Sequence, residues 1–434
     1  NGKPTVFSDK DNSKTRREYN AKGLLTALTD VAGQTTRYGY NANGQIEAVI
    51  DPMGRKTQYF WNREGLLEKV VDPRGHKRQL HYDTWGNVIA QAHFAAGAKH
   101  SSTTKYRYSE TGQVLEVILP DGGSHTYTYN TNDQLIRHSD PKGRATQFVY
   151  DGLSQVIERI DAEGQRLKYE YDTERNLTAL INENGERYQF FYDGNERLIK
   201  EIGFDGRVQN YKYNAAGHLI KHLDAGEIVT EFKRDALGRM LSKQSANLTL
   251  ASKGYRQAQI TRYGYDAKNR LIETYNNDQY CHFTYNALGC LVKEHHSDLN
   301  AKKQRIPATM VDIDYTNIWP GIRSSLKLPD GSTVHYGFDQ YNLLTGVAFN
   351  GQAITHIERD NFGRETTRHQ GALTTHSEYD PMGRLKKQSS YNQLNKTAGP
   401  VQREYGYDAF GNLSQLTEGN RDAETQTRYI YDLI

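Results

Sequence analysis

Residues 30–51 read DVAGQTTRYGYNANGQIEAVID and contain two turn signals separated by two short strand-like runs. The first turn signal is Asn-Ala-Asn-Gly at 41–44, and the second, Asp-Pro-Met-Gly, begins at Asp51. Asn and Asp side chains bond to nearby backbone, Pro presets φ, and Gly accepts positive φ. Between the turns, residues 36–40 and 46–50 alternate in character with period two, which is typical of strands. The stretch therefore predicts one β-hairpin.

The same pattern returns every 21 residues along most of the chain. Each copy has an anchor residue, then usually Asp or Asn, and in most copies a Gly after two further positions. With one longer step of 26 residues, the series runs through Tyr19, Tyr40, Trp61, Tyr82, Tyr108, Tyr129, Tyr150, Tyr171, Tyr192, Tyr213 and Arg234. It continues less evenly at Tyr265, Tyr285, Phe338, Arg359, Tyr379, Tyr407 and Tyr431. A fixed period indicates a repeat architecture, so we expect an all-β array of antiparallel hairpins with little helix.

The recurring turn residues are interpreted as structural anchors of the repeat. Tyrosine can cover apolar surface with its hydroxyl in water, Asp can accept backbone hydrogen bonds, and Gly can supply positive φ. A catalytic carboxylate pair occurs once in a protein, whereas these aspartates recur, which favours the structural interpretation. The assigned anchors are Tyr19, Gly23, Tyr40, Gly44, Tyr82, Gly86, Tyr129, Tyr150, Asp151, Tyr171, Asp172, Tyr192, Asp193, Tyr213, Gly217, Tyr265, Asp266, Tyr379, Asp380, Tyr407 and Asp408.

Composition favours a sheet one layer thick. Only 36% of the residues are hydrophobic even with tyrosine counted, and the mean hydropathy is -0.84. The regular spacing of 31 tyrosines and of turns argues against disorder. No apolar run approaches the ~18 residues of a membrane span. The net charge of +3 comes from interspersed residues of both signs, so no nucleic-acid partner is expected.

Two segments carry a family resemblance, DPMGRKTQYFWNREGLL at 51–67 and DPKGRATQFVYDGLSQVI at 140–157. They resemble the YD repeat of the Rhs family of bacterial toxins. The resemblance covers essentially the whole chain, and it implies a long antiparallel sheet wound into a hollow spiral shell around a toxin made from the C-terminal end of the same polypeptide. Because a single hairpin cannot bury its few apolar residues alone, and strand twist accumulates along a ribbon, winding is also physically reasonable.

The domain prediction is one shell segment over residues 1–434, with no separate catalytic domain. Four stretches interrupt the period, at 92–104, 245–260, 298–322 and 389–402. They are polar with small residues or proline, which favours long hairpin tips or loops over independent domains. The segment at Trp319, Pro320 and Gly321 is the best candidate for a plug or contact, although a loop pinned by one buried tryptophan explains it more simply.

The search for chemistry predicts no catalytic, cofactor-binding or metal-binding residues. If Tyr285 pairs with Cys290 across a turn, then Cys281 lies opposite Glu294, about 13 Å along the strand from Cys290. That distance is too long for a disulfide, so two free thiols are expected. His295 and His296 are adjacent and should point to opposite faces of a strand, which favours two solvated side chains over a shared metal.

The resemblance implies an encapsulating, non-enzymatic segment of a secreted bacterial toxin. Type VI secretion effectors are the favoured branch and the C component of insecticidal toxin complexes comes next. The implied partners are the chain's own C-terminal toxin domain and a secretion spike protein or chaperone. Rhs cores usually end in a self-cleavage motif that this sequence does not contain, so we expect the parent chain to continue beyond Ile434. Two alternatives remain: a surface YD-repeat protein that binds carbohydrate or neighbouring cells, and a glycosidase.

Overall fold

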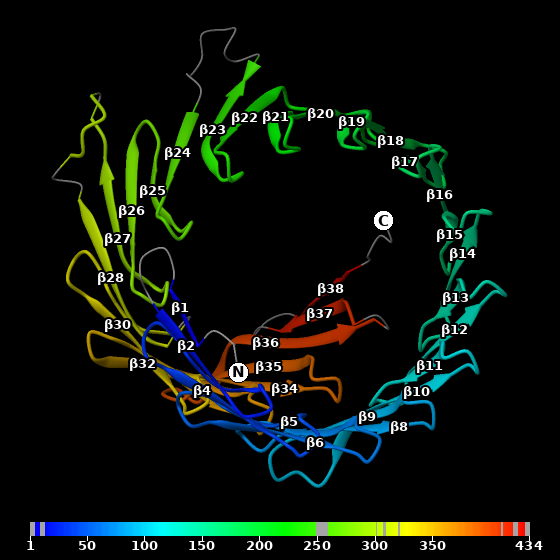
Figure 1. Ribbon diagram of the computed structural model, residues 1–434, viewed down its shortest axis with the longest axis horizontal. Coiled ribbons are helices and arrows are strands. Elements are labelled where there is room, and N and C mark those ends of the chain that lie inside the picture. Colours follow the sequence, from blue (N-terminus) through cyan, green and yellow to red (C-terminus); the bar gives the residue numbers. More distant parts are fainter. Residues whose placement is uncertain are drawn as a thin grey trace. The chain divides into compact units, whose positions relative to one another are not determined.

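The computed structural model describes residues 5–8, 14–248, 259–300, 302–306, 310–319, 322–408, 411–419 and 424–429, without the side chains of 8 and 317–319. These residues contain 38 strands of one antiparallel sheet and no complete helix (Figure 1). The expected all-β fold is therefore confirmed. Contacts divide the chain into two units. Unit 1 comprises Asn1–Arg144, Ala287–Cys290 and Tyr315–Ile434, and unit 2 comprises Ala145–Asn286 and Leu291–Asp314.

Unit 1 contains the first and the last strands. The first are β1 (Val6–Ser8), β2 (Lys14–Tyr19), β3 (Leu25–Thr29), β4 (Thr35–Tyr40), β5 (Ile46–Ile50), β6 (Lys56–Trp61), β7 (Leu67–Val71), β8 (Lys77–Tyr82), β9 (Val88–Phe94), β10 (Ser101–Tyr108), β11 (Val114–Ile118), β12 (Ser124–Tyr129) and β13 (Leu135–Ser139). The last are β29 (Ile322–Lys327), β30 (Thr333–Phe338), β31 (Leu344–Phe349), β32 (Gln352–Arg359), β33 (Glu365–Gln370), β34 (Leu373–Tyr379), β35 (Leu385–Asn392), β36 (Thr397–Tyr407), β37 (Leu413–Gly419) and β38 (Glu424–Arg428).

Unit 2 contains the strands between them. They are β14 (Ala145–Tyr150), β15 (Val156–Ile160), β16 (Arg166–Tyr171), β17 (Leu177–Ile181), β18 (Arg187–Tyr192), β19 (Leu198–Ile202), β20 (Val208–Tyr213), β21 (Leu219–Leu223), β22 (Ile228–Arg234), β23 (Met240–Asn247), β24 (Gln259–Tyr265), β25 (Leu271–Tyr275), β26 (Gln279–Tyr285) and β27 (Leu291–Asp298). The strand β28 (Val311–Trp319) has its first four residues in unit 2 and the others in unit 1.

Within each unit, consecutive strands pair in a meander. In the hairpin of β4 and β5, Tyr38 pairs with Val49 and Tyr40 pairs with Ile46, with a bulge between Gly39 and Tyr40. A register shift falls directly before an anchor in every hairpin of this kind, from Tyr19 to Tyr407. A bulge adds one unpaired residue and increases the local twist. The sequence pattern predicts the hairpin but not this bulge.

The register of the cysteine hairpin differs from the one that the sequence predicts. Tyr285 pairs with Leu291 rather than with Cys290, and Cys281 pairs with His296 rather than with Glu294. The loop is one residue longer than expected and the bulge adds a second residue, so the partner moves by two positions. Neither cysteine is in a disulfide, and both are half-buried.

The turns are of two kinds that alternate along the ribbon. We call the turn inside each hairpin, directly after the anchor, the anchor turn, and the turn that joins one hairpin to the next the linking turn. In the anchor turn at 41–44, the Asn41 amide donates to Gln45 O at 2.9 Å and Gly44 has a φ of 82°. This is the three-residue hairpin loop that ends in a left-handed residue. The linking turn after Asp51 has the same hydrogen bonds.

The interruptions of the period fall at linking turns. The tips between β9 and β10 and between β35 and β36 span 95–100 and 393–396, so most of the expected loops at 92–104 and 389–402 are strand. The strand β28 likewise lies inside the stretch 298–322 that was expected to be a loop. Most of 245–260 lies outside the described residues, as do Tyr431, Pro320, Gly321 and the side chain of Trp319.

The sheet has little interior. Among the described residues the buried hydrophobic side chains are Ala27, Ala48, Ala92, Ala95, Leu167, Ala179 and Ile357, and no large side chain is fully buried. Backbone pairing and turn contacts therefore carry much of the organisation that a packed core provides in a globular domain.

Candidate functional site

The anchor turns are closed by their own Asp or Asn side chains. In the turn at Asp151, Oδ1 accepts the amides of Leu153 at 2.8 Å and Gln155 at 2.9 Å. Asn41 makes the same two bonds at 3.0 Å with Asn43 and Gln45. Because only one side-chain oxygen is needed for the backbone, the turn accepts a carboxylate or an amide equally well.

The second carboxylate oxygen is free for a side chain four residues later. In the turn at Asp193, Arg197 Nη2 lies 2.6 Å from Oδ2 and its guanidinium also lies over the Tyr213 ring at 5.1 Å. The hydrogen bond from Arg197 is the main cause that lowers the pKa of Asp193. The same ion pair recurs at Asp266 with Arg270 and at Asp380 with Arg384. Asp172 and Asp408 instead accept from the side-chain amides of Asn176 and Asn412.

The anchor tyrosines donate their hydroxyls to the neighbouring hairpin. Tyr40 Oη donates to Leu25 O at 2.7 Å, and Tyr171 Oη donates to Val156 O at 2.8 Å. The acceptor is in each case the first residue of the strand that follows the preceding anchor turn. We call this bond the latch. It recurs at Tyr82, Tyr108, Tyr129, Tyr192, Tyr213, Tyr265, Tyr285, Tyr379 and Tyr407.

Three anchors that are not tyrosine make the same latch with a different donor. Trp61 Nε1 donates to Ile46 O at 2.8 Å, and Arg359 Nη2 donates to Leu344 O at 2.9 Å. Arg234 Nε reaches Leu219 O at 3.5 Å. These anchors share a long side chain with an N–H or O–H donor, whereas the anchor Phe338 has none. The pKa of Tyr171 is raised by burial first, and then by nearby Tyr169 and Asp151, so its hydroxyl keeps the proton that it donates.

All the predicted anchors occupy these positions. Each assigned tyrosine is the last residue of its strand, including Tyr19 and Tyr150, and each assigned aspartate follows directly. Gly23, Gly44, Gly86 and Gly217 have φ between 75° and 89°. Sequence reasoning missed the latch, because its acceptor is a backbone carbonyl that no side-chain pattern marks.

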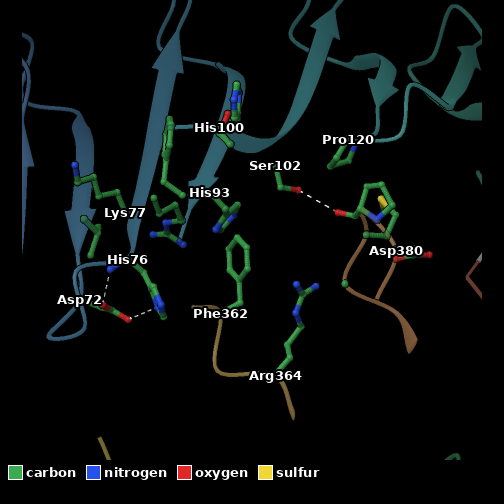
Figure 2. A pocket seen from close by; sticks show the side chains of 17 residues that line it. Asp72, His76, Lys77, His93, His100, Ser102, Pro120, Phe362, Arg364 and Asp380 are labelled. Carbon is green, nitrogen blue, oxygen red and sulfur yellow. Dashed lines mark hydrogen bonds and ion pairs between the residues drawn. The ribbon is translucent and has the colours of Figure 1, made fainter. Parts of the chain in front are cut away.

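Unit 1 also contains a cavity of about 820 Å³ between β7–β10 and the turns at 360–383 (Figure 2). His76 Nδ1 lies 2.9 Å from Asp72 Oδ2, Nε2 contacts the carbonyl oxygen of Asn361, and the ring stacks on Phe362 with centroids 6.2 Å apart. Ser102 Oγ donates to Pro381 O at 3.4 Å. These contacts hold two distant parts of unit 1 together.

The wall of this cavity carries charged groups of both signs, including Arg78 and Arg364 beside Asp72 and Asp380. Arg78, His93 and Ser102 form one row across three strands. Burial lowers the pKa of His93, with a further contribution from Arg78, so its ring is held neutral. Within the described part of the chain no group of three or more His, Cys, Asp or Glu side chains could hold a metal ion. No described helix is long and apolar enough to cross a membrane.

These features define a tandem β-hairpin protein whose hairpins are joined by a donor at the Tyr-Asp position. The sequence model of the teneurin YD-shell family matches residues 6–150 and 76–255, which together make up more than half of the chain. The chain belongs to the teneurin YD-shell family.

The chain is also similar in sequence to one toxin and in fold to Tc toxin structures. Double-stranded DNA deaminase toxin A of Burkholderia cenocepacia (strain H111) is 30% identical over 191 residues, which cover 40% of this chain and 12% of that protein. The crystal structure of TcdB2-TccC3 without its hypervariable C-terminal region has a TM-score of 0.65 at 12% identity, over 99% of this chain and 31% of that one. The Tc holotoxin pore of Photorhabdus luminescens, with a mutated TccC3, has a TM-score of 0.60 at 12% identity, over 95% and 30%. The chain thus spans about a third or less of these proteins.

Proposed function

We propose that this chain is part of the wall of a secreted bacterial toxin and encloses a toxin segment from the C-terminal end of the same polypeptide. Its family is a shell family, its sequence relative is named a toxin, and its fold is that of Tc toxin chains. Type VI secretion is the favoured delivery route, with a spike protein or chaperone as a further partner. The insecticidal toxin complex is the second route.

The observation that carries this proposal is the latched hairpin array with almost no interior. Backbone pairing and latches connect each hairpin to the next, and the largest side chains remain partly accessible. A sheet that needs no packed layer on either face can serve as a thin wall. A globular enzyme of this length would instead bury large apolar side chains in one or more cores.

Protection of the C-terminal segment tests the proposal. The natural polypeptide is treated with a non-specific protease, and the survival of its C-terminal segment is compared with that of the same segment expressed alone. We expect survival at least tenfold longer in the full chain, with no toxicity from residues 1–434 alone. Equal digestion rates, or toxicity of residues 1–434, would contradict enclosure.

One cluster in unit 2 favours the alternative of carbohydrate binding. Tyr188 stacks on Phe190 with centroids 4.8 Å apart, and Phe204 meets Tyr188 edge-on at 5.6 Å. Tyr188 and Phe204 line a cavity of about 490 Å³ together with Asp205 and Arg207. Aromatic faces beside charged groups suit sugar rings. Glycan-array binding that is lost in Phe204→Ala, but kept in Phe60→Ala, would move this function to first place.

A further inference from the structure

The hairpin of β26 and β27 in unit 2 brings a thiol, an imidazole and a carboxylate into a chain of contacts (Figure 1 places the two strands). Cys281 Sγ lies 3.2 Å from His296 Nδ1. His296 Nε2 lies 3.0 Å from Glu294 Oε2. A carboxylate can only accept, so the Nε2 nitrogen carries the proton and the Nδ1 lone pair is directed at the thiol. A nucleophile next to a base, with the base held by a third group, is the arrangement of an activated side chain.

The local fold produces this arrangement directly. Glu294 and His296 are two residues apart on one strand and therefore share a face. Cys281 is the direct cross-strand partner of His296. The flanking strands contribute Thr274, which pairs with Cys281, and Val311 and Ile313, which pair with His296 and Glu294. The His296 side chain is partly solvated, with 39% of its surface exposed, and its ring also contacts two partners.

We propose that Cys281 is a nucleophilic thiol that exchanges with small disulfides, with His296 as its base and Glu294 as the residue that positions the imidazole. The thiol proton moves to His296 Nδ1 and the sulfur attacks one sulfur of the small disulfide. A new S–S bond forms, the old one breaks, and the departing thiolate takes the proton from His296. One disulfide is consumed and one is formed, so the step is balanced without another oxidant.

The charges around the thiol explain why a base is needed. Burial raises the pKa of Cys281, and Glu294 raises it further, so the resting group is a neutral thiol. Proton transfer would place an imidazolium 3.2 Å from the sulfur, and its positive charge would oppose both of these effects. That imidazolium would lie between the thiolate and the Glu294 carboxylate and compensate both charges. Asp298 and Tyr285 are further titratable groups on this face of the hairpin, and Thr274, Val311 and Ile313 do not titrate.

The side chains leave room for a reagent to approach. Cys281 is half-buried, and the His296 side chain is 39% exposed compared with 22% for Glu294. A mixed disulfide at Cys281 would break the contact between Cys281 and His296. The proposal concerns a site within the wall and does not depend on what the wall encloses.

Oxidised glutathione and the complete chain test this proposal, with the second cysteine, Cys290, as an internal comparison. Addition of glutathione to each cysteine is followed by peptide mass spectrometry between pH 5.5 and 8.5. We expect Cys281 to react at least about tenfold faster than Cys290 in the folded protein and at the same rate in urea. Cys290→Ser should leave the Cys281 rate unchanged.

Two variants separate chemistry from packing. His296→Gln should lower the Cys281 rate at least about tenfold, because the base that takes the thiol proton is removed. Glu294→Gln should lower the rate less, because the imidazole loses the carboxylate that positions it but keeps its contact with the thiol. If His296→Gln fails to fold, Glu294→Gln decides. Equal rates for Cys281 and Cys290 in the folded protein, or a rate that is unchanged in either folded variant, would overturn the proposal.

Discussion

In the regular strands β16–β21 the anchor side chains bind the backbone, whereas in the hairpin of β26 and β27 the cysteine, histidine and glutamate side chains bind one another. Tyr171 donates to a backbone carbonyl and Asp193 accepts from a backbone amide, as their counterparts in other repeats do. By contrast, His295 contacts Asp312 at 2.6 Å, and His296 contacts Cys281 and Glu294. A partner on the backbone is present in every repeat, so this chemistry recurs and is structural. The contacts of Cys281, His296 and Glu294 differ from the Asp–Arg ion pairs of the turns, which recur, and such single arrangements are where specific chemistry can be sought.

The largest expected effect in the regular strands is strain at an anchor turn. Gly217 has a φ of 81°, and a Cβ atom at this position would meet nothing within 4 Å beyond its chain neighbours. Gly217→Val should lower the free energy of unfolding by about 1–3 kcal/mol through backbone strain alone. Urea unfolding measures the loss, and Gly217→Asn, which tolerates this φ, is the milder control. Equal losses in the two variants would show that packing, rather than the left-handed φ, determines the loss in the free energy of unfolding.

Loss of one latch should have a smaller effect. Tyr171→Phe removes the donor to Val156 O and should cost about 1 kcal/mol, near the net contribution of one hydrogen bond. The same change at Tyr192 should cost the same amount, because its bond to Leu177 O has the same length. Tyr169→Phe is the control, since its hydroxyl has no hydrogen bond to a described residue. If the two substitutions changed the free energy of unfolding by different amounts, the repeats at Tyr171 and Tyr192 would not be equivalent.

One substitution in the same strands should stabilise the protein. Glu196 takes the place of the turn glycine and has a φ of 60°. Glu196→Gly should therefore raise the free energy of unfolding by about 0.5–1 kcal/mol, since glycine relieves the left-handed strain at some entropic cost. Asn195→Gly, one position earlier, lacks positive φ and should not stabilise. Thermal unfolding of the two variants distinguishes them.

A pH effect should appear in the hairpin region. Lys293 first, and then His295, lower the pKa of Asp312 below its usual value of 3.8. A depressed carboxyl pKa contributes stability above the unfolded pKa, and this contribution is lost as the pH falls through the folded value. Asp312→Asn should thus lower stability at pH 5–7 and match the natural chain near pH 2. Urea midpoints across this range measure the difference, and a variant with a constant deficit at all pH values would contradict it.

The smallest effect is expected at Asp151. Asp151→Asn should change stability by less than about 0.5 kcal/mol, because Asn41 already makes the same two bonds in its turn. Differential scanning calorimetry can set this limit. If Asp151→Asn removed an activity while stability was kept, the carboxylate would be catalytic and the repeat interpretation wrong at that position.

Sequence reasoning predicted the hairpins, the turn chemistry and the family, because these follow from local patterns. The side chain of Asp151 and the backbone of Gly44 take part in their turns in the expected way, since turn geometry depends on neighbours along the chain. The latch was missed because the donor can be Tyr, Trp or Arg and the acceptor is backbone. The pairing of Cys281 with His296 was missed because a longer loop and the bulge before Tyr285 each change the register by one residue. The contact of His76 with Asn361 joins residues 285 positions apart, and no local signal predicts it.

The meander also sets an order of folding. Each hairpin pairs with the strand made just before it, so it can form as soon as it leaves the ribosome, and short loops close quickly. The contacts of Arg55 with Gln340 and of His76 with Asn361 in unit 1 close over 285 residues, and that of Ser102 with Pro381 closes over 279. These contacts must wait until the later strands have been synthesised. The N-terminal hairpins of unit 1 therefore remain without these partners while about 280 further residues are synthesised, and a polypeptide released in this interval would expose that surface to proteases and chaperones.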